Sequence, residues 1–303
     1  MDRVLLHIGL PKTGTPPLQE KRFSRYPGIE YVGQTNLWRN PDARALLRAL
    51  LTGEDERVPP AIEESARHRP LVISDEALSF GEFMQRGAHW PIDNDPWSMA
   101  ARVRRILGPH VEVVMVLRNQ ADWLVSWHRQ GLKTGKYTER DFGRWLEAEL
   151  GTSGKDRLFG LLRYDRLHDA YAAAFGTAHV HAYLYERYQA RFPDLGAEIA
   201  GLVGLDPLRA RPLTTGPGDN VTGDTYRRVP GVLRRLRRVP AAQRVWDHLP
   251  GRIRGATRSV LMVSHKYHTV SAEQRERLHQ YFCSANRALA DRVTTDTSFV
   301  GYF

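Results

Sequence analysis

A short loop near the start of the chain contains the residue types that bind anions. The loop Pro11-Lys12-Thr13-Gly14-Thr15 follows residues 3–9, a run of mainly branched apolar residues that favours a buried parallel strand. Thr15 would be the N-cap of a following helix and Pro16 its first residue. Backbone N–H groups, the positive end of the helix and the Lys12 ammonium would then meet at one spot. We therefore expect this loop to bind a phosphate-like anion.

The order of residues in the loop differs from that of ATP- and GTP-binding loops, which read G-x-x-x-x-G-K-[ST]. Gly9 and Gly14 have the required spacing, but Thr15 follows the second glycine and Lys12 precedes it. A P-loop kinase would also need acidic magnesium ligands at a strand end, where this chain has Arg118. Alternatively, the loop has no function and is an ordinary strand-to-helix turn with a solvated lysine.

A second candidate anion site follows residues 111–117, the most strand-like run in the chain. This run ends at Arg118, and the spacing of Trp123 and Trp127 predicts a helix that also contains Ser126. Arg118 would supply a forked, permanently charged donor for a phosphate, and Ser126 would add a hydroxyl. Ligands of open α/β sheets gather at the carboxyl ends of the strands, where both candidate sites would lie. Without a ligand, Arg118 would be a surface arginine and Ser126 an ordinary helix serine.

The alternation of strand and helix patterns through residue 205 predicts an α/β fold with a doubly wound, largely parallel sheet. Further strands are expected in residues 28–33, 71–73 and 179–185, and further helices in 41–69 (broken at Pro59-Pro60), 98–107, 158–175, 194–203 and 271–292. Thr138 is expected to cap a helix with Phe142 and Trp145 on its buried face. We predict a single domain, 1–303, with a core of residues 1–205 and a C-terminal loop and helical extension of residues 206–303.

The composition is that of a soluble globular protein, with 42% hydrophobic and 26% charged residues. The formal net charge of +10 fits a polyanionic cofactor or acceptor. Nucleic acid is the weakest of the possible partners, because the arginines are scattered and no aromatic stacking platform accompanies them. Only six of the 44 basic residues are lysine, which makes Lys12 more notable. The segment Arg227–Arg238 predicts a basic amphipathic helix that packs on the protein or, alternatively, touches a membrane or an acidic acceptor.

Cysteine content and the N-terminal sequence bear on the location of the protein. Cys283 is the only cysteine, so no internal disulfide and no cysteine-based metal cluster can form. The chain begins its first strand within three residues, without the pattern of a signal peptide, and no run has the length of a membrane span. We expect a cytoplasmic protein.

Taken together, the two candidate sites resemble the cofactor site of the sulfotransferase superfamily that uses 3′-phosphoadenosine-5′-phosphosulfate (PAPS), close to its bacterial members. The loop at Lys12 looks like the 5′-phosphosulfate loop, and Arg118 with Ser126 looks like the 3′-phosphate site. Ser74-Asp75-Glu76 and Tyr185-Glu186 stand in a familiar order after later strands. The resemblance covers most of the first 210 residues, and is weak after the two cofactor elements.

This resemblance implies a P-loop-like three-layer fold and transfer of a sulfuryl group from PAPS to a hydroxyl or amine, such as that of a carbohydrate or natural product. Lys12 to Thr15 would bind the 5′-phosphosulfate, with Lys12 also stabilising charge on the leaving group. Arg118 and Ser126 would bind the 3′-phosphate. Glu76 occupies the place of the catalytic base in the glycan-type members, with Asp75 as the weaker candidate. The small-molecule branch uses a histidine instead, for which His89 or His128 could serve; no metal is needed.

Pro16-Pro17 departs from the family's loop, which usually continues with a second threonine. Proline has neither a backbone N–H nor a hydroxyl, so position 16 loses two possible donors and position 17 loses one. Each lost charge-assisted bond costs about 1.5–3 kcal/mol, enough to weaken PAPS binding roughly tenfold or more. A catalytically weak or inactive module of the same fold, which binds a glycan or a protein partner, is therefore the main alternative. The alternative to a catalytic role for Glu76 is a structural one, in which Glu76 caps a helix that begins near Ala77.

Overall fold

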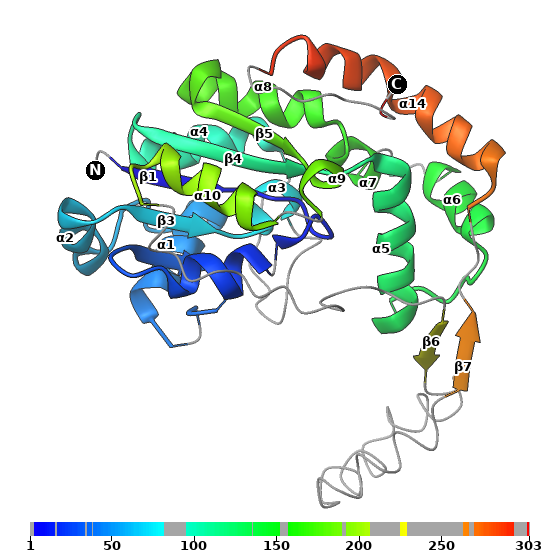
Figure 1. The fold of residues 1–303 in the computed structure, drawn as a ribbon, viewed down its shortest axis with the longest axis horizontal. Coiled ribbons are helices and arrows are strands. Elements are labelled where there is room, and N and C mark those ends of the chain that lie inside the picture. The colour runs from blue at the N-terminus through cyan, green and yellow to red at the C-terminus, as the bar shows by residue number, and fades with distance from the viewer. Residues whose placement is uncertain are drawn as a thin grey trace, which may run out of the picture.

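A computed structural model describes most of the first 206 residues and the last long helix (Figure 1). The described residues are 3–15, 17–33, 35–37, 39–81, 95–134, 136–151, 157–189, 192–206, 225–228, 263–266, 270–293 and 302. The predicted boundary between a core of residues 1–205 and an extension of residues 206–303 stays a prediction, because most of 207–262 lies outside these ranges.

The described strands and helices alternate along the chain. The strands are β1 (Val4–His7), β2 (Glu30–Gly33), β3 (Leu71–Ser74), β4 (Val111–Leu117), β5 (Val180–Leu184), β6 (Thr225–Arg228) and β7 (Val263–Lys266). The α-helices are α1 (Pro41–Thr52), α2 (Pro60–His68), α3 (Ala77–Phe80), α4 (Pro96–Leu107), α5 (Gln120–Thr134), α6 (Phe142–Gly151), α7 (Arg157–Leu161), α8 (Tyr164–Phe175), α9 (Tyr185–Tyr188), α10 (Phe192–Leu202) and α14 (Ala272–Ala290). A π-helix η1 (Pro17–Arg22) and the 3₁₀ turns η2 (Phe23–Arg25) and η4 (Thr177–His179) complete the set.

The central sheet has five strands in the order β2-β3-β1-β4-β5, and every neighbouring pair is parallel. From β1 the chain passes to the edge strand β2, returns to β3 beside β1, and then crosses to β4 and β5 on the other side. The strand order therefore reverses at β1. In open α/β sheets, the crevice at the carboxyl ends of the strands next to such a reversal is where ligands bind. The predicted doubly wound parallel fold is confirmed.

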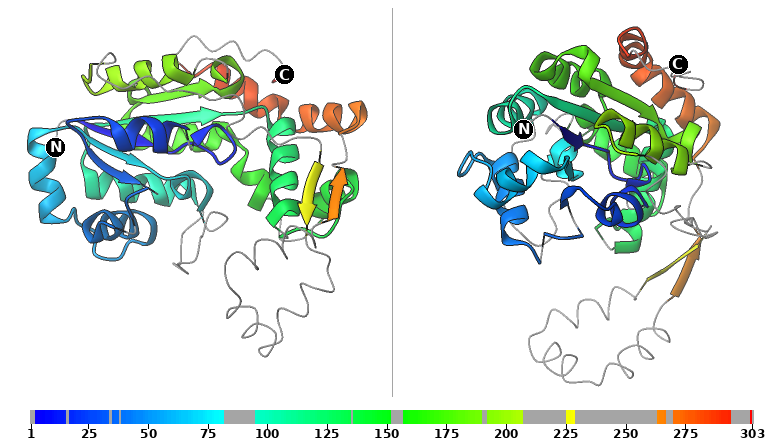
Figure 2. Two further views of the ribbon diagram at one scale, coloured as in Figure 1. Left: turned by 60° about the horizontal axis from the view of Figure 1, so that its bottom comes forward. Right: turned by 60° about the vertical axis from the view of Figure 1, so that its left-hand side comes forward.

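Helices cover both faces of the sheet, as Figure 2 shows. Side chains alternate along β1, so Val4 and Leu6 join one buried cluster with α1, α4, α5 and α8, whereas Leu5 joins another with η1, η2 and α10. The three layers are thus helix, sheet and helix, as predicted. The C-terminal helix α14 lies along α8 and α5, far from the start of the chain in sequence but adjacent to the core in space (Figure 1).

The helix predicted after the Lys12 loop differs from expectation. The turn over Pro17–Arg22 is π-helical, not α-helical, and a 3₁₀ turn follows it. Thr15 already lies in a helical turn instead of capping one, and its hydroxyl donates back to the Leu10 carbonyl, 3.1 Å away. A physical reason is that an N-cap accepts from the N–H two or three positions later, and Pro17 has none. Pro16 lies outside the described residues.

Three other expectations need correction. Asp141, not Thr138, caps α6: its Oδ1 atom accepts from the backbone N–H of Arg144 at 2.8 Å. The single helix predicted over residues 158–175 is divided into α7 and α8. Arg227 and Arg228 belong to β6, which pairs antiparallel with β7, and not to a helix. The rest of the Arg227–Arg238 segment lies outside the described residues, so contact with an anionic surface there stays a prediction.

Candidate functional site

Three neighbouring strands bring most of the predicted site residues to one edge of the sheet. Strand β1 lies between β3 and β4, so the loop after β1 lies between Glu76, which follows β3, and Arg118, which follows β4. The turn after β3 also contacts the loop directly, because the Ser79 hydroxyl donates to the Gly9 carbonyl at 3.5 Å. The parallel sheet therefore assembles residues that lie far apart in the sequence.

The backbone of the loop alternates in handedness. Lys12 and Gly14 have positive φ angles of 69° and 77°, whereas the residues between and beside them do not. Such an alternation directs successive N–H groups towards one concave spot, an arrangement that binds anions. Among the described residues, the N–H groups of Gly14 and Thr15 donate to no other backbone group. Thr13 and Thr15 turn their hydroxyls inward to the Leu10 carbonyl, which leaves backbone N–H groups as the loop's outward donors.

Arg118 reaches back from the end of β4 to this loop. Its Nη1 atom donates to the Lys12 carbonyl at 2.9 Å, and its guanidinium lies over the Tyr185 ring, 4.8 Å from the ring centre. The buried Nε atom has no hydrogen-bond partner among the described residues. An unpaired buried donor is costly, so a charged nitrogen left unpaired beside an anion-binding backbone indicates a place for a ligand oxygen.

Ser126 lies half-buried on α5, two turns after the helix begins. No hydrogen bond of its hydroxyl to another described residue brings it to the loop or to Arg118. The structure therefore brings Lys12, Thr13, Gly14, Thr15 and Arg118 together, and leaves Ser126 on the helix that follows Arg118.

Glu76 is buried at the position immediately before α3. Its side chain makes no capping bond to α3, which argues against the capping alternative. Asp75 makes that kind of bond instead: its Oδ1 atom accepts from the Ala77 N–H at 2.8 Å. Asp75 is thus occupied in shaping the turn, which leaves Glu76 as the better candidate base of the two.

The histidine alternatives are less well placed. His128 is buried on α5, where its Nε2 atom pairs with the Glu139 carbonyl at 2.9 Å and its ring packs against Phe142 and Trp145. These contacts make it part of the core between α5 and α6. His89 lies outside the described residues.

Several residues that support the loop were missed by sequence reasoning. The indole of Trp123 on α5 donates to the Pro11 carbonyl at 2.6 Å, and so connects the helix after β4 to the loop after β1. The spacing of Trp123 from Trp127 in the sequence indicated that Trp123 is buried, but not that it bonds to Pro11. Under the loop, His7 is fully buried and bonded to Ser74, and Gln19 bonds to Ser74 as well. A polar residue at the end of an otherwise apolar strand was the signal available for His7.

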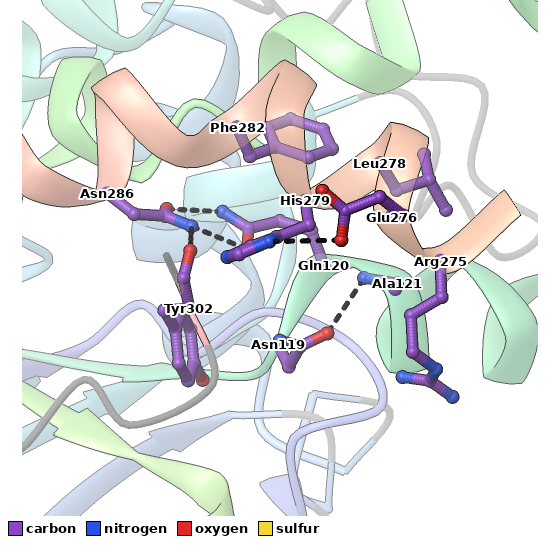
Figure 3. Close-up of a pocket in the computed structure, with 10 residues that line it drawn as sticks. All are labelled: Asn119, Gln120, Ala121, Arg275, Glu276, Leu278, His279, Phe282, Asn286 and Tyr302. Atoms are coloured by element: carbon purple, nitrogen blue, oxygen red, sulfur yellow. Dashed lines mark hydrogen bonds and ion pairs between the residues drawn. The ribbon is translucent and has the colours of Figure 1, made fainter. Parts of the chain in front are cut away.

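A buried polar network holds the turn between Arg118 and α5 (Figure 3). The Glu186 carboxylate accepts from the Asn119 N–H at 2.9 Å and from the Tyr302 hydroxyl at 2.8 Å. The amides of Gln120 and Asn286 bond to each other, and Asn286 also donates to the Tyr302 carbonyl. Residues 286 and 302 thus fasten the C-terminal part of the chain to the turn that carries Arg118.

The pocket drawn in Figure 3 lies beside this network, between the start of α5 and α14. Its volume is about 180 Å³, well below the roughly 300–1,000 Å³ of a typical ligand pocket. It is therefore too small for a nucleotide, and it lies on the α14 side of the turn.

Burial shifts the pKa values of two residues near the site, so that His7 stays neutral and Tyr164 stays protonated near pH 7. Burial lowers the pKa of His7 to about 4, so its ring is neutral near pH 7. Burial, and then the nearby Glu186 charge, raise the pKa of Tyr164 well above its usual value. Tyr164 therefore stays protonated, and its hydroxyl donates to the Arg118 carbonyl at 2.7 Å.

Among the described residues, no group of three or more His, Cys, Asp and Glu side chains could hold a metal ion. Nor is any described helix both long and apolar enough to cross a bilayer.

No sequence model of a protein family matches this chain, and no curated protein matches its sequence. Its structure is similar to that of a sulfotransferase from Alicyclobacillus acidocaldarius, with a TM-score of 0.57, 13% identity and 98% of each chain covered. A structure of retinol dehydratase in complex with androsterone and the inactive cofactor PAP also matches, at a TM-score of 0.38 and 12% identity over 98% of this chain and 82% of that one. On the first of these similarities and the sheet order, the chain has the three-layer α/β fold of the Alicyclobacillus sulfotransferase.

Proposed function

We propose that this protein transfers a sulfuryl group from PAPS to a hydroxyl, or an amine, of an acceptor molecule. One observation carries the proposal: the Arg118 guanidinium and the alternating backbone of the Lys12 loop meet at the same strand ends, with Arg118 Nη1 2.9 Å from the Lys12 carbonyl. Two sources of positive potential at one edge suit a cofactor with anionic groups on both the 3′ and the 5′ positions of its ribose.

The residues present fit such a cofactor. Gly14 and Thr15 offer backbone N–H groups with no other backbone partner among the described residues, and Arg118 offers a buried Nε atom in the same condition. These are donors only, as phosphate and sulfate oxygens require. Lys12 adds a positive charge in the same loop, and Glu76 adds a buried carboxylate one strand away.

When bound, PAPS supplies the sulfuryl group for in-line displacement, a reaction that depends on positioning and electrostatics. The loop N–H groups of Thr13, Gly14 and Thr15 hold its 5′ end, and Lys12 stabilises negative charge on the departing phosphate. Arg118, with Ser126 on the next helix, holds the 3′-phosphate. Glu76 accepts the proton of the acceptor hydroxyl at its carboxylate. Lys12 and Arg118 supply the positive charge, so the proposal needs no metal.

The acceptor in this proposal is a hydroxyl-bearing carbohydrate or small natural product, not a nucleic acid. The alternative is a weak or inactive module that binds a glycan or protein. It is favoured by the π-helical turn at Pro17 and by the donors that Pro16-Pro17 removes from the loop's exit. Transfer activity separates the two, because a binding module would form no sulfated product.

The first test is calorimetric titration with adenosine 3′,5′-bisphosphate, with ATP and AMP as controls. We expect selective binding of the bisphosphate. Arg118→Ala should weaken that binding about 10- to 150-fold, the loss of one charge-assisted bond of about 1.5–3 kcal/mol. Arg118→Lys should recover only part of it, because lysine lacks the fork.

The matched control is Arg104→Ala, which removes the same charge from an exposed position on α4. It should leave the affinity unchanged. Equal losses from the two variants would mean that net charge, not a built site, attracts the nucleotide. No binding by the unaltered protein would overturn the proposed function.

A further inference from the structure

A chain of three buried polar side chains lies directly beneath the anion-binding loop. His7, the last residue of β1, places its Nδ1 atom 2.7 Å from the Ser74 hydroxyl at the end of β3. The Gln19 amide, from the π-helix η1, donates to the Ser74 carbonyl at 3.2 Å and to the Ser74 hydroxyl at 3.1 Å. All three side chains are buried, so the chain joins two strands and the π-helix without contact with solvent.

The hydrogen bonds of this chain have a definite direction. A carbonyl can only accept, so the Gln19 atom facing the Ser74 carbonyl is its NH₂ group, which also donates to the Ser74 hydroxyl. The buried ring is neutral, because its pKa is lowered to about 4. We assign the Ser74 hydroxyl hydrogen to His7 Nδ1, which places the single N–H of the neutral ring on Nε2.

The Nε2 atom of His7 is directed at Gly9, two residues before the loop. It is buried and has no hydrogen-bond partner among the described residues. A Cβ atom on Gly9 would lie 2.5 Å from it, which is too close for any side chain. The backbone of the loop therefore rests on the imidazole, and position 9 has room only for glycine.

The end of the loop at Pro16-Pro17 is also held by hydrogen bonds to a distant strand. Pro16 and Pro17 provide no N–H groups for a regular helix start, and the turn that follows is π-helical. Gln19 lies in that turn and fastens it to β3 by two hydrogen bonds. His7 supports the loop where it begins, and Gln19 holds it where it ends. Ser74 connects the two.

We propose that His7, Ser74 and Gln19 are positioning residues that set the shape of the anion-binding loop and so preserve its affinity for the 5′ end of the nucleotide in spite of Pro16-Pro17. The inference rests on the proposed function. None of the three residues touches the ligand: they act through Gly9 and through the π-helix.

The test compares Ser74→Ala and Gln19→Leu with the unaltered protein in calorimetric titrations with adenosine 3′,5′-bisphosphate, well below each melting temperature. Each substitution removes two hydrogen bonds of the chain and should weaken binding about five- to tenfold. The double variant should lose no more than the worse single variant, because both substitutions break the same chain.

The control is Ser65→Ala, which removes a similar hydroxyl bond, 2.6 Å long, between α2 and Glu30 on β2. It should lower the melting temperature and leave the affinity unchanged. If Ser74→Ala and Gln19→Leu behave as Ser65→Ala does, the chain only stabilises the fold and the inference is overturned. If Gln19→Leu does not fold, Ser74→Ala, which removes one oxygen atom, carries the test.

A second measurement checks the direction of the chain. Nitrogen NMR of the histidine rings should show His7 protonated at Nε2 and not at Nδ1, and a perturbed His7 signal in Ser74→Ala. A ring protonated at Nδ1 would contradict the inference. Failure of the unaltered protein to bind the bisphosphate would overturn the proposed function together with the inference, whereas binding unaffected by the variants would overturn the inference alone.

Discussion

The loop after β1 and the turn after β4 perform similar tasks with different local structures. Both place a basic residue at the carboxyl end of a central parallel strand, Lys12 in one and Arg118 in the other. After Arg118 the chain enters α5, a regular helix of 15 residues. After Lys12 it passes through a backbone of alternating handedness into a π-helix of six residues.

The difference lies in what holds each helix start. Asn119 caps α5 locally, because its Oδ1 atom accepts from the N–H groups of Ala121 and Asp122 at 3.0 and 3.4 Å. The turn that begins at Pro17 is fastened to β3 by Gln19, whose amide donates to the carbonyl and the hydroxyl of Ser74. Local sequence rules therefore predict the start of α5 after β4, whereas the start of η1 after β1 depends on a partner that is distant in the sequence. The predictions below test this contrast.

The largest effect is expected at Lys12. Its positive φ of 69° suits glycine, so Lys12→Gly removes the ammonium and relieves the backbone at the same time. We expect unchanged or slightly greater stability, together with a loss of sulfuryl-transfer rate of about 10²–10³-fold, the usual effect of removing one group that stabilises transition-state charge. Steady-state kinetics and thermal unfolding measure the two quantities.

Lys133→Ala, at the exposed end of α5, is the control and should retain the full rate. A rate in Lys12→Gly close to that of the unaltered protein would remove Lys12 from the mechanism.

The second effect concerns the pH dependence of stability. The unfolded chain binds a proton at His7 near pH 6.5, whereas the folded protein binds it only near pH 4. Stability should therefore be complete above pH 6.5 and fall as the pH decreases from about 6.5 to about 4, by about 3 kcal/mol from this residue. Denaturant unfolding at several pH values measures it.

In His7→Asn this contribution should disappear, so the difference between the two stability curves should shrink as the pH falls. Burial also lowers the pKa of His168, which both proteins retain, so the difference isolates His7. Two parallel curves would show that His7 does not titrate as described.

The smallest effect is expected at the cap of α5. Asn119→Ala should lower the free energy of unfolding by about 1 kcal/mol, as the loss of an N-cap does. Because Asn119 is adjacent to Arg118, it should also weaken binding of the bisphosphate severalfold. Asn40→Ala removes a similar cap, at the start of α1, where Asn40 Oδ1 accepts from Asp42 and Ala43. It should cost similar stability without altering affinity; equal affinity losses would mean that the cap at Asn119 has no special link to the site.

Much of the fold could be predicted from patterns in the sequence. The apolar runs at residues 71–73, 111–117 and 179–185 became β3, β4 and β5, and Pro59-Pro60 divided α1 from α2 as expected. These features succeed because they depend on side-chain periodicity and on the missing N–H of proline, which act locally.

The errors occurred where a local rule competed with another hydrogen-bond partner, either nearby in the chain or on a distant strand. Thr15 satisfied the composition of an N-cap, but its hydroxyl found the Leu10 carbonyl. Thr138 was the predicted cap for α6, but the helix begins at Phe142, so Asp141 serves instead. Arg227 and Arg228 lie on a helical pattern in the sequence, yet they pair with β7. Only in this last case is the deciding partner distant in the sequence, since Leu10 and Arg144 are near neighbours of Thr15 and Asp141.

By itself, the sequence determined which residues could form an anion site, because lysine, arginine and glycine at strand ends are recognisable from composition and spacing alone. Only the tertiary structure decided that β1 lies between β3 and β4, which sets the Lys12 loop between Glu76 and Arg118. The tertiary structure alone also placed His7, Ser74 and Gln19 beneath that loop. The physical reason is that periodicity reports which side chains are buried, whereas strand order and buried hydrogen bonds depend on how the whole core packs.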